Sequence, residues 1–311
     1  MQFVPSMFLL RGQPVAQPRP VTLRCGVPAG LPPLKYWRER IKLHGRAMLY
    51  PAQTARWLDL LNGHVLMNEL VDSCPRLLYK IYRPYLTTRL EMDARIAALA
   101  WHYDFVLLRG LEQLSCQAAR GGVRLASVAG RSGLHYALML EAGQFLEREG
   151  ELVLSLCQDG AVVYSAAFTF CAGGIGIGCI QGSNRGDGLD AIRTATRELH
   201  GVRPKQLLVT LLGHLAYVLG GERLHLVGNA NRVVRSAIRQ GKVCADYDQL
   251  WREMGAHQRA DGDFTLACMA LSEAPELDEV PSKRRAEVRR RHATVAALAE
   301  AMAARFRAQP Q

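Results

Sequence analysis

The sequence has no apolar run long enough to cross a membrane. Its longest runs, such as Leu207–Leu212, are far shorter than the roughly 20 residues that a bilayer requires. The N-terminal stretch MQFVPSMFLLRG holds a short apolar patch, but no positive residue precedes it and Pro5 interrupts it. We therefore expect no transmembrane helix, an unprocessed N-terminal tail and a cytoplasmic chain.

Cysteines are present but never at the spacing of a metal site. The eight residues form no CxxC pair and no Cys/His cluster, and several fall within apolar strand patterns. This usage is typical of buried free thiols in a reducing compartment, so we expect no bound metal. The cysteines are Cys25, Cys74, Cys116, Cys157, Cys171, Cys179, Cys244 and Cys268.

Basic residues exceed acidic ones, giving a net charge of +11. The excess predicts attraction to an anionic partner, whether a nucleotide cofactor, an anionic membrane surface or, less favoured, nucleic acid. Two dense clusters, Lys35–Arg46 and Lys283–Arg291, lie near opposite ends of the chain. Both look helical, and solvated helix faces are the favoured interpretation of each.

Four regions follow from composition and hydrophobic periodicity. Proline and glycine make residues 1–33 an irregular tail, and helical spacing of apolar residues predicts a helical layer over residues 34–118. Residues 119–272 form an α/β core, and residues 273–311 a basic C-terminal helix that packs on it. The packed face of that helix is expected to comprise Ala297, Leu298, Ala301 and Met302.

The core begins with antiparallel strands. Strand patterns start at Val123 and Leu134, and become strong from Leu152, where Asp159-Gly160 marks a hairpin turn. The segment Gly174–Val227 then predicts strand, helix, helix and strand, with its two strands parallel through a right-handed crossover. The longer helix begins at Pro204 and ends at a glycine pair.

This order resembles the core of the acyl-CoA N-acyltransferases, a GNAT-like fold, and implies an α/β (α+β) protein with a mixed sheet. The resemblance implies a cofactor site at a helix start. Here Arg203, Lys205 and Gln206 begin a helix whose free N–H groups attract anions, although the paired glycines of the family are missing. The expected ligand is acyl-CoA or an acyl carrier protein thioester.

Other residues of the expected cofactor site come from the neighbouring strands. Glycines in a strand permit close approach of a ligand or of another backbone, so the three in GIGIG could lie beside the pantetheine arm or in a crowded sheet. After the last parallel strand, an asparagine could cap a short helix that carries Arg232, Arg235 and Arg239. The residues concerned are Gly174, Gly176, Gly178, Asn229 and Asn231.

No catalytic motif stands out, so the candidates are single residues. A neutral imidazole can accept a proton near neutral pH, which makes His200, His102 and His135 candidate bases. The family tyrosine is replaced in the corresponding helix, so Tyr247 or a histidine would have to substitute. The segment after Lys242 is predicted to be extended, and Asp246-Tyr247-Asp248 could form a carboxylate wall or cap a helix.

Over residues 34–295 the chain also resembles the VirK/YbjX family of proteobacterial proteins. That family has no assigned activity and is linked to virulence and the cell envelope of Gram-negative bacteria, which implies one integrated domain in the cytoplasm, possibly peripheral at the inner membrane. The segments that carry the resemblance are 73–90 (SCPRLLYKIYRPYLTTRL), 102–111 (HYDFVLLRGL), 147–156 (EREGELVLSL), 177–182 (IGCIQG), 192–208 (IRTATRELHGVRPKQLL), 227–256 (VGNANRVVRSAIRQGKVCADYDQLWREMGA) and 282–293 (SKRRAEVRRRHA).

Two hypotheses about function remain. The first is an acyltransferase that moves an acyl group from a thioester to an amine or hydroxyl acceptor tied to the envelope, since acyl transfer needs little beyond a base and oxyanion donors. The second is a non-catalytic accessory protein that binds an anionic ligand, lipid or nucleic acid through the same fold. The oligomeric state is not predicted.

Overall fold

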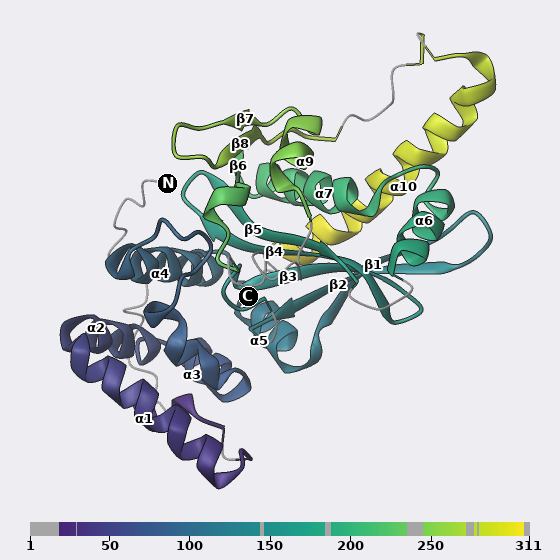
Figure 1. Cartoon of the computed structure of the whole chain (residues 1–311). Helices are drawn as coiled ribbons and strands as arrows, with labels where there is room; N and C mark the ends of the chain where they lie inside the picture. Colours follow the sequence, from purple (N-terminus) through teal and green to yellow (C-terminus); the bar gives the residue numbers. More distant parts are fainter. Residues whose placement is uncertain are drawn as a thin grey trace.

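The computed structural model describes residues 19–28, 30–143, 146–183, 188–234, 245–271, 277–278 and 280–307. It has a mixed sheet with helices on both faces, an N-terminal helical layer and a long C-terminal helix (Figure 1), which confirms the predicted α/β class. Over these ranges no helix is apolar and long enough to span a bilayer. The same ranges contain no group of three His, Cys, Asp or Glu residues that could hold a metal ion.

Proline begins three elements of the N-terminal layer. Pro33, Pro51 and Pro75 each lie in a first helical turn, where a missing N–H leaves no helical hydrogen bond unmade. Trp57 and Leu61 are buried, as their helical spacing predicts. The layer comprises η1 (Leu23–Gly26), α1 (Pro33–Leu49), α2 (Pro51–Leu61), α3 (Val65–Ser73), η2 (Pro75–Tyr82), α4 (Met92–Leu108) and α5 (Glu112–Gly121).

The sheet has eight strands in the order β1-β2-β3-β4-β5-β6-β8-β7. The first five are antiparallel neighbours, and the predicted hairpin turn between β3 and β4 has positive φ at Asp159 (47°) and Gly160 (82°), as a tight two-residue turn requires. The strands are β1 (Val123–Ala129), β2 (His135–Ala142), β3 (Leu152–Gln158), β4 (Ala161–Cys171), β5 (Gly174–Gly182), β6 (Arg223–Leu226), β7 (His257–Gln258) and β8 (Phe264–Ala267).

The predicted crossover is confirmed. Strands β5 and β6 are parallel, in a register that runs from Gly174 opposite Arg223 to Ile177 opposite Leu226. Two helices join them, α6 (Gly188–Glu198) and α7 (Pro204–Val218), and α7 buries its leucine stripe against the sheet. Beyond β6 the sheet continues into β8 and β7, two short strands that the sequence pattern did not indicate.

Two local predictions near the C-terminus are wrong. The segment after Lys242 is not extended up to Asp248, because α9 (Tyr247–Glu253) begins there with Asp246 as its N-cap, accepting from Gln249 N–H at 3.0 Å. The alternative capping interpretation is therefore confirmed. In α10 (Ser282–Phe306), Ala297 and Ala301 are exposed. Its packed face instead comprises Leu298, Ala299, Met302, Ala303 and Phe306.

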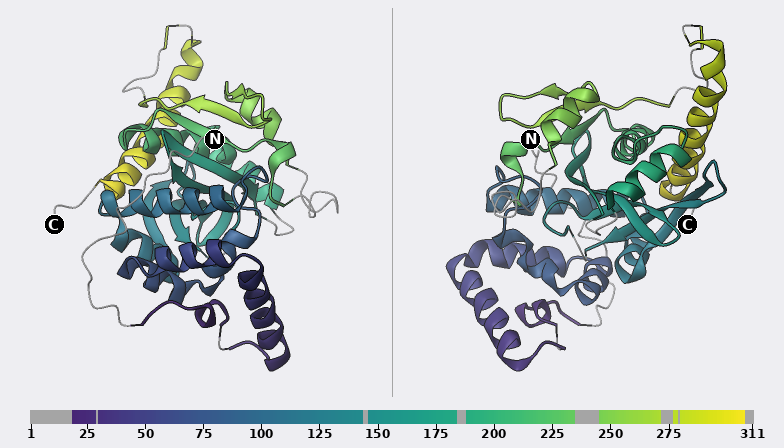
Figure 2. Two further views of the ribbon diagram at one scale, coloured as in Figure 1. Left: turned by 90° about the vertical axis from the view of Figure 1, so that its left-hand side faces the viewer. Right: turned by 45° about the vertical axis from the view of Figure 1, so that its right-hand side comes forward.

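Helices cover both faces of the sheet, and α6 packs on β4, β5 and α7. Helices α7 and α10 pack against one another and on one face, whereas α4 and α5 cover the other, with α1 to α3 outside them (Figure 1). Leu43, Leu208 and Met302 belong to one continuous hydrophobic cluster. The first half of α10 projects beyond the sheet, and α1 lies at the opposite margin of the molecule (Figure 2).

Candidate functional site

Strands β5 and β6 separate after Ile177. The last hydrogen bond between them joins Val227 N–H to Ile177 O at 3.1 Å. Beyond it β5 continues to Gly182 paired with β4 on one side, after an irregularity in the register of that pair. On the open side of β5, the Ile180 N–H donates to the Tyr247 hydroxyl oxygen at 2.8 Å. A gap beyond the carboxyl ends of parallel strands is where open α/β sheets bind ligands.

A hydrogen-bonded chain starts at this gap. The Tyr247 hydroxyl donates to Cys179 Sγ at 3.3 Å. The Glu149 carboxyl lies near enough to the Cys179 thiol that each side chain shifts the pKa of the other. We call Glu149, Cys179 and Tyr247 the relay. Each is at most 3% exposed. Tyr247, Cys179 and Glu149 thus lie in sequence along the path that a proton would follow from the hydroxyl to the carboxylate.

Electrostatics make Glu149 the base of the relay. Burial raises its pKa to about 6, even though Cys179 and the Arg232 guanidinium act in the opposite direction. Burial also raises the pKa of the Cys179 thiol and of the Tyr247 hydroxyl, so both are protonated at neutral pH. Glu149 Oε1 has no hydrogen-bond partner among the described residues, which leaves it able to accept a proton.

Arg232 lies within the same cluster, away from solvent. It is 2% exposed, its guanidinium carbon lies 3.7 Å from the Tyr247 ring centroid, and its Nη1 donates to Ala245 O at 3.0 Å. Arg235 and Arg239 lie outside the described residues. A buried cation beside the relay stabilises negative charge on Glu149.

A basic hollow adjoins the same end of β5. It lies between α6 and the start of α7 and has a volume of about 680 Å³. A Cβ at Gly182, the last residue of β5, would lie 2.9 Å from Ile192 Cδ1 and 3.2 Å from the Tyr164 ring, and both side chains line the hollow. Its lining residues are Tyr164, Asp190, Ile192, Arg193, Thr194, Thr196, Arg197, Arg203, Pro204 and Lys205.

The predicted anion-binding residues lie at this hollow. Arg203 and Lys205 line it from the first turn of α7, and Gln206 follows them half-buried. Arg203 Nη1 and Lys205 Nζ lie 3.9 and 3.6 Å from Glu253 Oε2, so both cations are linked to α9, the helix that begins with Tyr247. No side chain caps the start of α7, so no capping side chain accepts a hydrogen bond from the first backbone N–H groups of this helix.

The glycines of β5 accommodate neighbouring backbone, as expected for a crowded sheet. A Cβ at Gly174 would lie 2.0 Å from Arg223 O, and one at Gly178 would lie 2.1 Å from Glu149 O. Gly176 is buried and lies opposite Thr169 and His225 in the sheet. The close approach that the glycines allow is that of the protein's own backbone, and at Gly178 it brings Glu149 over the strand.

The two asparagines after β6 hold loops together. The Asn229 side chain donates to Asp246 at 2.7 Å and accepts from Tyr247 N–H at 2.9 Å, which fixes the start of α9. The Asn231 amide donates to Asp261 O and to Asp263 Oδ1 at 2.8 and 2.9 Å. Asn229 therefore positions Tyr247, and both asparagine side chains make hydrogen bonds within the protein.

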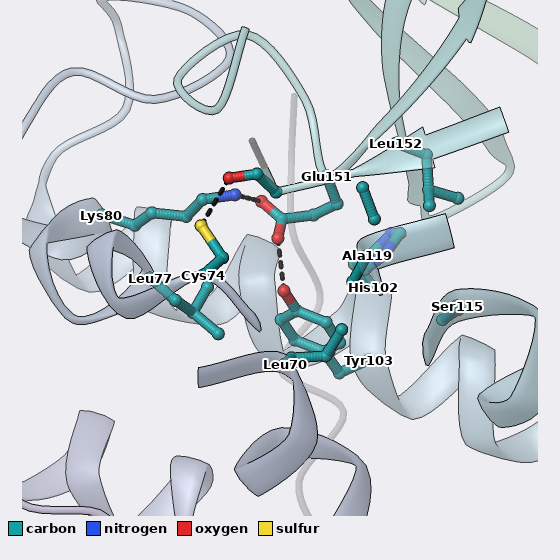
Figure 3. Close-up of a pocket in the computed structure, with 12 residues that line it drawn as sticks. Leu70, Cys74, Leu77, Lys80, His102, Tyr103, Ser115, Ala119, Glu151 and Leu152 are labelled. Atoms are coloured by element: carbon teal, nitrogen blue, oxygen red, sulfur yellow. Dashed lines mark hydrogen bonds and ion pairs between the residues drawn. The ribbon is translucent and has the colours of Figure 1, made fainter. Parts of the chain in front are cut away.

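A second buried polar cluster surrounds Glu151, two residues after Glu149 in the chain. Glu151 pairs with Lys80 at 2.5 Å and accepts a hydrogen bond from the Tyr103 hydroxyl, while the nearby Cys74 thiol donates to Gly143 O (Figure 3). Lys80 and Glu151 are at most 3% exposed over their side chains. The adjoining cavity of about 20 Å³ is large enough for one water molecule and too small for a substrate. We call Lys80, Tyr103 and Glu151 the sealed cluster.

His102 belongs to this sealed region. Its Nδ1 accepts from Phe170 N–H at 3.1 Å, and its ring stacks on Phe170. Burial lowers the pKa of His102 to about 4, against the opposing effect of Glu151, so the imidazole is neutral at physiological pH. It is a buried acceptor for the β4 backbone and has no path to the hollow or to the gap.

The remaining histidine candidates lie apart from the relay. His135 is exposed at the first position of β2, opposite Ala129. His200 occupies the turn after α6 with a φ of 54°, and its carbonyl accepts from Arg291 Nε at 3.0 Å. The structure thus brings Arg203, Lys205 and Tyr247 to one region and leaves His102, His135 and His200 outside it.

Sequence reasoning missed Glu149, Cys179 and Ile180. A signal was present in EREGE, where two glutamates flank Gly150 immediately before an apolar strand. Acidic residues at the start of a buried strand are costly unless paired, so this pair indicates buried polar partners elsewhere in the chain. The role of the Ile180 N–H depends on where β6 ends, and no residue type in the sequence predicts the end of β6.

The molecule is thus an α/β protein in which a buried cluster of Glu149, Cys179 and Tyr247 and a basic hollow lie near the end of the parallel strand pair. The chain belongs to the DUF535 family, described as a protein of unknown function, whose profile matches residues 33–304. It is 29% identical to the uncharacterized protein YbjX of Escherichia coli K12 over 289 residues, covering 88% of this chain and 86% of that protein. The resemblance to the YbjX family is confirmed.

Other similarities are weaker. An uncharacterized protein of Haemophilus influenzae is 24% identical over 84% of this chain and 88% of its own length. Among solved structures, a cAMP-binding acyltransferase from Mycobacterium smegmatis aligns with a TM-score of 0.30 and 14% identity, over 68% of this chain and 65% of that chain. A point mutant of the same enzyme aligns with a TM-score of 0.29 and 15% identity, over 67% of this chain and 66% of that chain. The alignment with these structures covers just under two thirds of their length.

Proposed function

We propose that the protein is an acyltransferase that takes its acyl group from a thioester of coenzyme A or of an acyl carrier protein. The observation that carries the proposal is the Ile180 N–H, which lies beyond the last hydrogen bond between β5 and β6 and donates to the first hydroxyl of the relay at 2.8 Å. A backbone donor and a base relay at one point are the minimal apparatus of acyl transfer.

In the proposed reaction the thioester carbonyl oxygen replaces the Tyr247 oxygen as the acceptor of the Ile180 N–H. The amine or hydroxyl acceptor attacks the carbonyl carbon, and its proton passes to Tyr247 while the relay shifts one proton through Cys179 to Glu149. The new C–N or C–O bond forms and the C–S bond breaks. The leaving thiolate then takes up the proton that Glu149 received, which returns through Cys179 and Tyr247 and restores the carboxylate. A concerted shift requires no free phenolate or Cys179 thiolate, both of which burial disfavours.

The basic hollow is the proposed site for the phosphate groups of the carrier. Four cations, Arg193, Arg197, Arg203 and Lys205, line it, with Asp190 as the acidic lining residue. Phosphate oxygens accept charge-assisted hydrogen bonds from such side chains and from free helix N–H groups. Its position at the end of β5 would direct the pantetheine arm toward Ile180. An acceptor tied to the cell envelope would follow from the family resemblance.

Calorimetric titration with acetyl-CoA, a long-chain acyl-CoA and an acyl carrier protein thioester tests the binding step. We expect the wild type to bind at least one of them and Arg203→Glu/Lys205→Glu to lose it, since each charge-assisted contact is worth about 1.5 to 3 kcal/mol. Arg223→Glu is the matched control, because Arg223 is exposed at the other end of the parallel pair. No binding by the wild type, or equal binding by the double variant, contradicts the carrier site.

A second candidate, the non-catalytic accessory protein, is favoured by one observation. Every member of the relay is buried, so the gap is closed in this structure. Assaying release of free thiol from the bound thioester with amine and hydroxyl acceptors separates the two functions. Carrier binding without thiol release, in the wild type as in Tyr247→Phe, supports the accessory role.

A further inference from the structure

Helix α1 exposes large apolar side chains on its outer face. Leu34, Trp37, Ile41 and Met48 are separated by three, four and seven residues, which places them along one side of the helix. They are 85, 56, 69 and 81% exposed, whereas Leu43, on the opposite side, is fully buried. The helix is therefore anchored by one face and presents a second apolar face outward.

This concentration is specific to α1. Of the ten exposed large hydrophobic residues among the described residues, six lie between Leu34 and Tyr50. The helix lies at the margin of the molecule in each view, away from the sheet and from the basic hollow (Figures 1 and 2). Contiguous exposed apolar side chains of this size mark a surface that another phase or molecule covers.

Cations surround the apolar face. Helix α1 carries five basic residues and one acidic residue, Glu39, which lies 3.5 Å from Arg38 and 3.2 Å from Lys42. Helical geometry places Arg38 and Lys42 on one flank of the apolar side chains and Arg40 on the other. The Arg40 guanidinium lies 5.4 Å from the Trp37 ring centroid, at the border of the two zones.

We propose that α1 is a membrane-surface anchor that inserts its outer face into the headgroup region of an anionic phospholipid bilayer. An apolar stripe with a tryptophan, bordered by arginine and lysine, combines burial of apolar surface with attraction to anionic headgroups. Self-association of two copies through the same face would bring two strongly basic helices together, which like-charge repulsion opposes. The proposal does not depend on acyl transfer.

Trp37 is a built-in reporter for the experiment. The chain has four tryptophans, of which Trp57 and Trp251 are at most 1% exposed and Trp101 is half-buried. Emission of the full-length protein is followed while vesicles of phosphatidylethanolamine and phosphatidylglycerol are added, with pure phosphatidylcholine vesicles in parallel. We expect a blue shift and co-sedimentation with anionic vesicles alone, weakened by high salt.

Two sets of variants separate the contributions. Leu34→Ser/Ile41→Ser/Met48→Ser should abolish co-sedimentation, and Lys35→Gln/Arg38→Gln/Lys42→Gln should weaken it roughly 100-fold, since each cation near an anionic surface contributes about a factor of five to ten. Leu189→Ser/Met269→Ser is the matched control, because both residues are exposed by more than 70% elsewhere on the surface. Arg289→Gln/Arg290→Gln/Arg291→Gln tests the other basic cluster and should leave folding intact, with at most a small loss of binding.

Several outcomes would overturn the anchor. These are no binding to anionic vesicles, equal binding to neutral ones, or binding that the serine variant retains. A blue-shifted Trp37 without vesicles that turns red after removal of residues 1–18 would show that the chain itself covers the face. A concentration-dependent dimer that the serine variant dissolves would show that a second copy does.

Discussion

Two buried glutamates, Glu149 and Glu151, lie 2 residues apart and experience opposite environments. Glu151 has a cation at 2.5 Å and a tyrosine hydroxyl as donors, and although burial acts to raise its pKa, Lys80, His102 and the Tyr103 hydroxyl together lower it. Glu149 has a thiol beside it and an oxygen without a hydrogen-bond partner among the described residues, and burial raises its pKa to about 6.

Under the proposed function, the difference separates a structural cluster from a catalytic one. A buried carboxylate with its donors in place fixes the packing of η2 and α4 on the sheet and has little capacity left to react. A buried carboxylate that lacks hydrogen-bond donors destabilises the folded state, and such destabilisation is typical of groups that must accept a proton during a reaction. Both clusters are buried, so burial alone does not distinguish them.

The largest effect is expected from breaking the sealed cluster. Lys80→Met leaves Glu151 charged and unpaired in the interior, which should lower the free energy of unfolding by about 3–5 kcal/mol. Lys80→Met/Glu151→Leu removes both charges and should recover most of that loss. Urea denaturation at pH 7 measures both. A single variant as stable as the double would show that the ion pair is not what holds this region.

The second-largest effect is expected from the tyrosines of the two clusters, Tyr247 in the relay and Tyr103 in the sealed cluster. Tyr247→Phe removes the entry of the relay and should lower acyl transfer on the order of 100-fold. Tyr103→Phe removes a donor to Glu151 and should cost about 1–3 kcal/mol of stability with turnover unchanged. Thiol-release kinetics and thermal unfolding of both variants make the comparison. Equal loss of turnover in the two variants would erase the distinction.

The smallest effect concerns the two buried thiols. Cys179→Ala interrupts the relay and should reduce turnover at least tenfold, while Cys74→Ala, beside the sealed cluster, should leave turnover unchanged. Each should cost about 1 kcal/mol of stability or less. Cys179→Ser replaces the thiol with a hydroxyl that can also pass a proton, so this variant should retain part of the activity that Cys179→Ala loses. Turnover of Cys179→Ala at the wild-type level would place the proton path elsewhere.

The sequence predicted the fold better than the site, for physical reasons. The leucine stripe after Pro204, the Asp159-Gly160 turn and the apolar strands are periodic, so they specify α7, the hairpin and the parallel pair. Strands β7 and β8 are short and half-exposed, and nothing periodic marks them.

The site depends on contacts between distant segments. Tyr247, Cys179 and Glu149 are brought together by the end of β6, the capping of α9 and the glycine at position 178, each of which acts through the backbone. Of the candidate residues, Tyr247 could be proposed because the resemblance to the N-acyltransferases implies a tyrosine in this part of the fold. Glu149 could not be told from Glu151 by residue type, since their partners lie elsewhere in the chain.

The most direct test of this account is the pH dependence of stability in Glu149→Gln and Glu151→Gln. The raised pKa of Glu149 means that ionisation opposes folding: the penalty is absent below pH 4.5, grows up to about pH 6 and is complete above it. Glu149→Gln should therefore be more stable than the wild type by about 2 kcal/mol at pH 8, from roughly 1.5 pKa units, and equal to it below pH 4.5.

The lowered pKa of Glu151 gives the opposite sign, because its contribution is present above the unfolded pKa and is lost as the pH falls through the folded one. Glu151→Gln should be less stable than the wild type by about 3 kcal/mol at pH 8, and the deficit should shrink on acidification. Chemical denaturation of the three proteins between pH 4 and 8 provides the measurement. Opposite signs at pH 8 are the predicted result, and destabilisation of similar size in both variants would contradict the account.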